Sequence, residues 1–228
     1  AARCPSGPGL LVAHRAEDGE VLWARRLQAG FGGWQYPCVG RIGGRLVVVA
    51  GIGDNPWLAT ASPGEPWIPF AFKLLLGRLQ YRLAAVRRRV FGVPARRNAV
   101  AAYDAETGEQ LWLWEEEPWG YWAAAGDEET LWDRSRRSQE DHRRDAICGP
   151  DNWGIPAITA DGTVLAGSGS TGRLYAIRDA DGDGRIGEGE VKTFETGQGF
   201  LNGPALAPGM MAVAPCWGPM YVFKSDAK

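Results

Sequence analysis

The chain is short of the residues on which most enzyme chemistry depends. It has only two histidines, His14 and His142, and neither has a nucleophile beside it in the sequence, so no catalytic dyad is predicted. Its four cysteines, at positions 4, 38, 148 and 216, form neither an adjacent pair nor a C-x-x-C zinc motif. Their spacing leaves two alternatives open, one structural disulfide or free buried thiols.

An excess of charge and a long hydrophobic run are missing too. The formal net charge is -2, which gives no electrostatic basis for binding nucleic acid. No apolar run approaches the ~20 residues of a membrane span, and no signal peptide is present in the sequence. The disulfide alternative favours a secreted, periplasmic or lumenal location. With 32 glycines, 15 prolines and 45% hydrophobic residues, the composition indicates a folded, turn-rich protein.

What the chain does contain is an internal repeat. Each copy has an alternating apolar strand, an acidic turn with glycine and a second strand with an aromatic residue. The copies lie at residues 10–27, 98–115, 172–197 and, ending early, 218–228. Pairs of strands joined by glycine turns precede the last three, at residues 36–49, 155–167 and 203–214. Repeated units of this kind predict an all-β fold, a β-propeller of four-stranded antiparallel blades.

The amino-acid sequence of the repeat resembles the repeat of a known family. The segments AYDAETGEQLW at 102–112 and DGTVLAGSGSTGRLYAI at 161–177 are similar to the pyrroloquinoline-quinone (PQQ) repeat of quinoprotein-like propellers. That family includes quinone-dependent dehydrogenases and non-catalytic assembly platforms, so the resemblance implies a fold rather than a function. Three to four blades are present, fewer than most closed propellers have. We therefore expect a truncated or processed segment of a larger propeller, with exposed sheet edges.

The most specific chemical signal is a calcium-loop pattern. Residues 179–190, DADGDGRIGEGE, match D-x-D-x-D-G-x5-E at every required position. The predicted ligands are three carboxylates, one carbonyl and a bidentate glutamate: Asp179, Asp181, Asp183, Arg185 and Glu190. Because the flanking residues are predicted strands, Ca²⁺ would stabilise a hairpin rather than act as a sensor. The alternative is a solvated turn without metal, in which the carboxylates would repel one another.

Two insertions interrupt the repeat. Residues 55–97 lie between strands two and three of the second blade, and within them the apolar positions of 70–90 share one helical face. One interpretation is a basic amphipathic helix that places residues 67–90 on an anionic membrane surface or in a partner's groove. The favoured one is a helix packed on the propeller. The second insertion, residues 118–147, is predicted to be a charged and aromatic loop.

Tryptophans are abundant and most are predicted to pack between blades. Trp23 and Trp112 hold equivalent fourth-strand positions, so both should be buried. Asp151, Asn152 and Trp153 form the one cluster with the residue types that quinone enzymes use. Such enzymes draw these residues from several blades, however, so a turn capped by Asp151 is the favoured interpretation.

Two functions from different classes remain. The favoured one is a non-catalytic, calcium-stabilised propeller that acts as a protein-interaction or assembly scaffold, with a protein or the remaining blades as partner. The alternative is a fragment of a PQQ-dependent alcohol or sugar dehydrogenase. The resemblance implies adjacent cysteines beside the quinone, and the chain has no such pair. PQQ is therefore not an expected cofactor, whereas Ca²⁺ is.

Overall fold

A computed structural model gives the structure of the chain. It describes residues 9–28, 31–33, 35–54, 96–121, 123–128, 130, 134, 137 and 151–225. In this part of the chain every strand pairing is antiparallel, and η1 (Glu188–Glu190) is a single 3-10 turn. No helix among these residues is long and apolar enough to cross a membrane. The all-β prediction is confirmed.

The strands form four sheets, which are named here in chain order. Sheet one contains β1 (Leu10–His14) and β2 (Val21–Arg26). Sheet two contains β3 (Phe31–Gly33), β4 (Cys38–Ile42), β5 (Arg45–Asp54), β6 (Asn98–Asp104) and β7 (Gln110–Glu115). Sheet three contains β8 (Ala157–Ile158), β9 (Val164–Gly167), β10 (Arg173–Ile177) and β11 (Val191–Glu195). Sheet four contains β12 (Ala205–Ala207), β13 (Met210–Val213) and β14 (Tyr221–Lys224).

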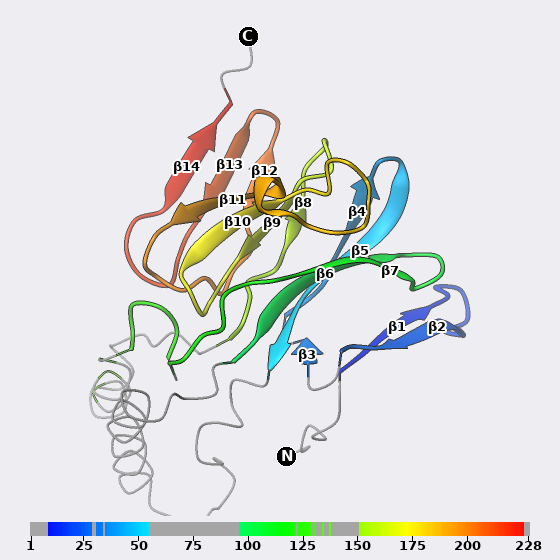
Figure 1. The fold of residues 1–228 in the computed structure, drawn as a ribbon, viewed down its shortest axis with the longest axis horizontal. Helices are drawn as coiled ribbons and strands as arrows, with labels where there is room; N and C mark the ends of the chain where they lie inside the picture. The colour runs from blue at the N-terminus through cyan, green and yellow to red at the C-terminus, as the bar shows by residue number, and fades with distance from the viewer. Residues whose placement is uncertain are drawn as a thin grey trace, which may run out of the picture.

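The sheets follow one another in a row with two ends (Figure 1). Sheet three is the predicted four-stranded antiparallel unit, with strands in chain order. Sheet two has the same order from β4 to β7, and its long β5 pairs with β3 as well as β4. Among the described residues, sheet one has the two strands of the repeat hairpin, and sheet four has three strands. The described strands therefore form an open series of repeated units.

Each junction between neighbouring sheets holds one hydrophobic cluster. Strand alternation divides β6 between two of them, because successive side chains point to opposite faces. Val100 and Ala102 pack toward sheet three, whereas Ala101 and Tyr103 pack toward sheet one. A third cluster, centred on Phe200, joins sheets three and four. β6 carries small residues because it is buried on both faces.

The two repeat tryptophans lie in these junctions as predicted. Trp23 is 9% exposed and Trp112 is 4% exposed. Their equivalent places in β2 and β7 are confirmed by register, since Trp23 lies opposite Ala13 and Trp112 opposite Ala102. Both hairpins have a register shift at the next residue pair, so the two copies share an irregularity as well as a pattern.

The first insertion leaves the sheet between β5 and β6, where the sequence placed it. Asp54 and Arg97 face each other at its base, joined by backbone and side-chain hydrogen bonds. Arg96 forms an isolated antiparallel bridge with Trp119. The helix predicted within residues 70–90 lies outside the described residues, so the helix and the membrane interaction of residues 67–90 stay predictions.

The second insertion packs against the rest of the molecule in the part that is described. Residues 123–125 are buried, and the carboxylate of Asp127 is fully buried. Asp127 pairs with Arg134 at 2.7 Å and accepts a hydrogen bond from the Trp217 indole at 3.0 Å. The guanidinium of Arg134 lies 4.1 Å from the centre of the Trp217 ring. These contacts join the described part of the insertion to Trp217, in the turn between β13 and β14.

Candidate functional site

The calcium-loop pattern forms the turn between β10 and β11. Ile177 and Val191 are the last paired residues of the hairpin, and residues 178–190 project beyond them. Three of the predicted ligands come together there: carboxylate oxygens of Asp179, Asp181 and Asp183 all lie within 4.8 Å of one another. Hard cations such as Ca²⁺ prefer carboxylate oxygens in this kind of arrangement.

The turn is shaped by bonds between its carboxylates and its own backbone. Asp179 accepts from the N–H groups of Gly182 at 2.8 Å and Gly184 at 3.1 Å. Asp183 accepts from the Arg185 N–H at 2.7 Å. Gly184 has φ +79°, and a Cβ there would lie 3.1 Å from the Leu111 carbonyl of sheet two. Glycine is required at this position by both its backbone conformation and its close approach.

Glu190 is placed differently from the three aspartates. Its Oε1 accepts from the Ala180 N–H at 2.6 Å, and its Oε2 accepts from the Gly187 N–H at 2.8 Å. These bonds, that from Gly187 foremost, hold the pKa of Glu190 below its usual value. The carboxylate thus ties both ends of the loop together and stays ionised. Each oxygen retains a second acceptor direction, so this role is compatible with the predicted bidentate one.

Arg185 and Ile186 lie in the loop as the sequence predicted. The Arg185 side chain is exposed, which fits its prediction as a carbonyl ligand only. Ile186 packs against the cluster between sheets two and three, as its apolar character predicts. It also lines a cavity of about 330 Å³ beside Trp114 and Tyr175. The hairpin is therefore anchored to the junction, while Asp181 and Asp183 are exposed and Asp179 is half-buried.

A buried carboxylate joins the end of β7 in sheet two to the β9–β10 turn of sheet three. Glu116 follows β7 and is only 5% exposed. Its Oε1 accepts from Asn98 Nδ2 at 2.8 Å and Ser168 Oγ at 2.9 Å, and its Oε2 accepts from Thr171 Oγ1 at 3.0 Å. Ser168 and Thr171 belong to the turn between β9 and β10. One glutamate thus connects two sheets.

Burial dominates the protonation of this glutamate. It raises the pKa of Glu116 to about 7, although the hydrogen bonds from Asn98, Ser168 and Thr171 act in the opposite direction. Arg96 is buried nearby, and its desolvation lowers the pKa of that guanidinium to about 10. Arg96 therefore stays charged at neutral pH, and Glu116 titrates near neutrality. Sequence reasoning missed Glu116 because it stands in a run of three glutamates whose neighbours are exposed or half-buried.

The Asp151, Asn152 and Trp153 cluster serves packing. Asn152 Nδ2 donates to the Asp54 carbonyl at 2.9 Å, and Trp153 Nε1 donates to the Ile52 carbonyl at 3.2 Å. Both side chains are about 1% exposed. The Trp153 indole is enclosed in the cluster between sheets two and three, and Asp151 Oδ2 accepts a hydrogen bond from Gln35 Nε2 at 3.1 Å. Their role is to join sheet three to β5.

Cys38 does not take part in a disulfide. Cys38 is a free, half-buried thiol, and burial raises its pKa to about 11. A thiol of this kind is protonated and unreactive at neutral pH. The disulfide prediction is thus narrowed to the other three cysteines, two of which lie outside the described residues.

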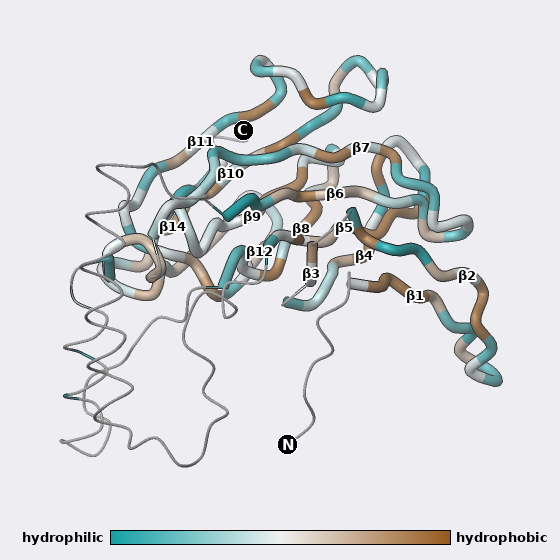
Figure 2. The backbone as a smooth tube through the Cα atoms, turned by 60° about the horizontal axis from the view of Figure 1, so that its bottom comes forward, coloured by the Kyte–Doolittle hydropathy of each residue, from teal (hydrophilic) through white to brown (hydrophobic). Residues whose placement is uncertain are grey.

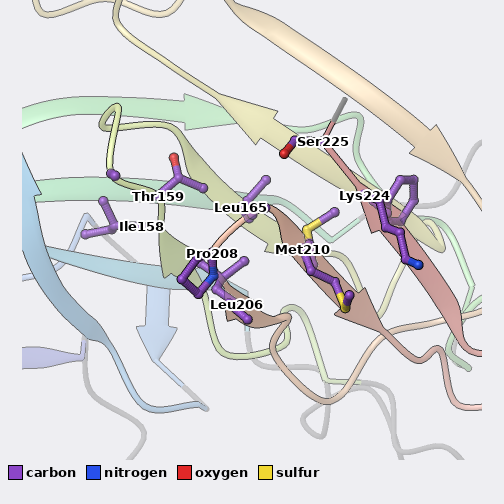
Figure 3. Close-up of a pocket in the computed structure, with 13 residues that line it drawn as sticks. Ile158, Thr159, Leu165, Leu206, Pro208, Met210, Lys224 and Ser225 are labelled. Carbon is purple, nitrogen blue, oxygen red and sulfur yellow. The ribbon is translucent and has the colours of Figure 1, made fainter. Parts of the chain in front are cut away.

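An apolar groove of about 800 Å³ lies between sheets three and four (Figure 3). Its walls are hydrophobic: Ile158, Leu165, Leu206, Pro208, Met210, Met211 and Phe223. Lys224 contributes the single charged group, and Thr159 and Ser225 contribute hydroxyls. The lining residues that the structure describes include no pair of groups for acid–base or nucleophilic chemistry. The groove has the shape and polarity to accept an apolar segment.

No family model matches the chain, and no curated protein matches its sequence. A quinohemoprotein alcohol dehydrogenase from Comamonas testosteroni is 17% identical with a TM-score of 0.48, over 96% of this chain and 31% of that chain. Another, from Pseudomonas putida, is 18% identical with a TM-score of 0.46, over 95% and 30%. The chain thus spans less than a third of either structure, and this similarity assigns it no activity.

Proposed function

We propose that the chain is a calcium-stabilised, non-catalytic set of propeller blades that serves in protein assembly. The observation that carries the calcium part is the convergence of Asp179, Asp181 and Asp183 within 4.8 Å on a turn whose sequence fits the calcium loop. The assembly part is supported by the open row of repeated sheets, whose two ends expose apolar residues such as Leu10 and Val222.

The role of the ion in this proposal is structural. The loop continues two paired strands, and residues 188–190 form only one 3-10 turn, so no pair of helices is available to open as in a sensor. Binding would neutralise the clustered carboxylates and fix the turn against sheet two through Gly184 and Ile186. The stability of the junction would then depend on Ca²⁺ through mass action.

Calorimetric titration tests the metal directly. The wild type should bind Ca²⁺ in preference to Mg²⁺, because the smaller ion demands a stricter octahedron. Asp179→Asn and Asp183→Asn should weaken binding at least about tenfold, which is 1.4 kcal/mol. Glu188→Gln is the matched control, since Glu188 is exposed in the same loop and outside the ligand pattern. Absence of Ca²⁺ binding in the wild type, or an equal loss in the control, would refute the assignment.

The second candidate is a part of a quinone-dependent alcohol dehydrogenase. It is favoured by the resemblance of residues 102–112 and 161–177 to the PQQ repeat. A dye-coupled alcohol oxidation assay with added PQQ and Ca²⁺ separates the two candidates. Turnover that depends on PQQ would establish the dehydrogenase and reject the non-catalytic scaffold. We expect no turnover, because no described group is placed for the chemistry.

A further inference from the structure

A cavity of about 330 Å³ lies between sheets two and three, beside the loop of residues 179–190. We call it the junction cavity. Its volume is at the lower end of the range for small-molecule pockets. Side chains of both sheets and of the loop line it, among them Trp114, Glu116, Arg173, Tyr175, Ile186 and Glu188. The junction cavity therefore has room for a small molecule.

The junction cavity extends along β10. Arg173 belongs to the first residue pair of the β10–β11 ladder and Val191 to the last, and both line the cavity. The two pairs are four residues apart, a distance of about 13 Å along a strand. Glu116 lies at the Arg173 end, because it accepts a hydrogen bond from Thr171, whereas Glu188 precedes Val191 at the other end. The cavity thus has a carboxylate residue at each end.

Aromatic rings line the middle of the junction cavity. Trp114 of β7 and Tyr175 of β10 have ring centres 4.7 Å apart and planes inclined at 60°. Tyr175 is the third of the five residues of β10, midway between the two ends. The faces of such rings attract cations through their quadrupole. Ile186, from the loop, adds an aliphatic wall. The middle of the cavity therefore suits a methylene chain next to positive charge.

Negative charge exceeds positive charge around the junction cavity. Among the lining residues that the structure describes, Arg173 is the only cation, and Glu195 and Glu117 pair with it at 2.8 and 3.6 Å. Glu188 forms no ion pair with any described residue. The hydrogen-bond donors of Glu116 are neutral amide and hydroxyl groups. In Figure 2 the tube is hydrophilic where β7 ends. Both ends of the cavity can therefore accept an additional cation.

Carboxylates at two ends with aromatic rings between them match a linear chain that carries ammonium groups. An ammonium group donates hydrogen bonds to carboxylates, and its methylene neighbours pack on aromatic and aliphatic side chains. Anionic ligands are excluded by like charge. A single metal ion is excluded as well, because Ca²⁺ needs about six to eight oxygens within about 2.6 Å. The two carboxylates are too far apart to share one ion.

We propose that the junction cavity binds a free linear polyamine, with one ammonium group at Glu116, another at Glu188 and the carbon chain against the aromatic rings. This inference goes beyond the proposed function, since it concerns neither calcium nor assembly. Glu188 lies outside the calcium ligand pattern, so the loop would contribute different residues to the two ligands.

Calorimetric titration of the full chain with spermidine tests the proposal. The titration is carried out at pH 8, above the pKa of about 7 of Glu116, so that this carboxylate is ionised. Saturating Ca²⁺ is present, so that the aspartates of the loop are occupied. We expect spermidine to bind at least about tenfold more tightly than 1,3-diaminopropane or n-butylamine, because these ligands cannot reach both carboxylates. Absence of spermidine binding, or equal affinity for n-butylamine, would rule the proposal out.

A lysine side chain of a protein partner offers the same ammonium chemistry. N-acetyl-lysine methylamide distinguishes this source from a free polyamine, because it carries a single ammonium group. It should bind at least about tenfold more weakly than spermidine. Binding as tight as that of spermidine would assign the cavity to a partner protein and overturn the polyamine assignment.

Charge variants locate the bound ligand. Glu116→Gln keeps the shape of the side chain and should weaken spermidine binding at least about tenfold. Glu188→Gln should weaken it about threefold, because Glu188 is exposed and an exposed ion pair contributes less. Glu106→Gln is the matched control, since Glu106 is an exposed residue of the β6–β7 turn and lies outside the cavity. It should bind spermidine like the wild type.

Two results with these variants would overturn the proposal. Equal losses in all three would show that spermidine follows the net charge of the chain, and unchanged affinity in Glu116→Gln and Glu188→Gln would place it elsewhere. Glu188→Gln changes an exposed loop residue, so the test stands even where Glu116→Gln weakens folding. Glu116→Gln should retain the Ca²⁺ affinity of the wild type, because Glu116 lies at the end of the cavity opposite the loop. A missing calcium site and a missing polyamine site are therefore distinct results.

Discussion

At the scale of single residues, two equivalent glycines have different surroundings. Gly108 is covered by the Trp23 indole, whereas nothing described covers Gly19. Gly19→Ala should cost about 1 kcal/mol through its positive φ alone. Gly108→Ala should cost about 1–3 kcal/mol more, because its Cβ would displace the indole. Urea unfolding of both variants measures the difference, and equal losses would mean that the Trp23 contact contributes nothing to stability.

Glu116 makes the stability of the folded chain depend on pH near neutrality. Its pKa in the folded protein is about 7, above the 4.5 of an exposed glutamate, so the folded state holds its proton to higher pH than the unfolded state does. The stability from this group is thus fully present below the unfolded pKa and is lost as pH rises to about 7. The loss is on the order of 3 kcal/mol.

Glu116→Gln tests this dependence. An amide of the same shape can still accept from Asn98 and Ser168, while the Thr171 hydroxyl can turn to accept from its amide group. The free energy of unfolding of the wild type, minus that of the variant, should therefore fall between pH 5 and pH 8. A difference that stays constant over this range would show that another group accounts for the pH dependence.

At the scale of elements, the β10–β11 hairpin should respond to calcium while sheet one does not. Saturating the loop at 100 times its Kd should stabilise the folded state by about 2.7 kcal/mol. Amide hydrogen exchange should slow in β10 and β11 on addition of Ca²⁺, and should be unchanged in β1 and β2 if sheet one opens independently. Asp179→Asn should lose the effect. Slowing that is uniform over all sheets would indicate that the ion acts on global unfolding only.

The strands could be predicted from the sequence where the signal comes from neighbouring residues. Period-two alternation and glycine turns located the strand pairs of all four sheets, because these signals depend on neighbouring residues. The pairing of β3 with the end of β5 was not visible, since Phe31–Gly33 is three residues long and two are glycine. Sequence also predicted that three aspartates would share one turn. It did not predict that the two oxygens of Glu190 would accept backbone bonds, because that depends on the path of the loop.

At the scale of the whole molecule, the repeat predicted the order of the sheets and the burial of Trp23 and Trp112. The hydrogen bonds of Glu116 could not be predicted from the sequence. Its partners Asn98, Ser168 and Thr171 come from segments far apart in the sequence. The Asp151 cluster showed the opposite problem: neighbours in sequence suggested a site, and the fold uses Asn152 and Trp153 for packing. A site whose residues come from different sheets gives no recognisable pattern in any single segment of the sequence.

The division of the core into separate junctions has a consequence for how such a protein can change over evolutionary time. Each hydrophobic cluster joins one sheet only to the next one along the chain. Duplicating or deleting a whole repeat therefore remakes a single boundary and leaves the others intact. Gene duplication in units of one repeat can lengthen the row without redesigning its interior, and each new copy is then free to acquire an expanded turn, as residues 179–190 did.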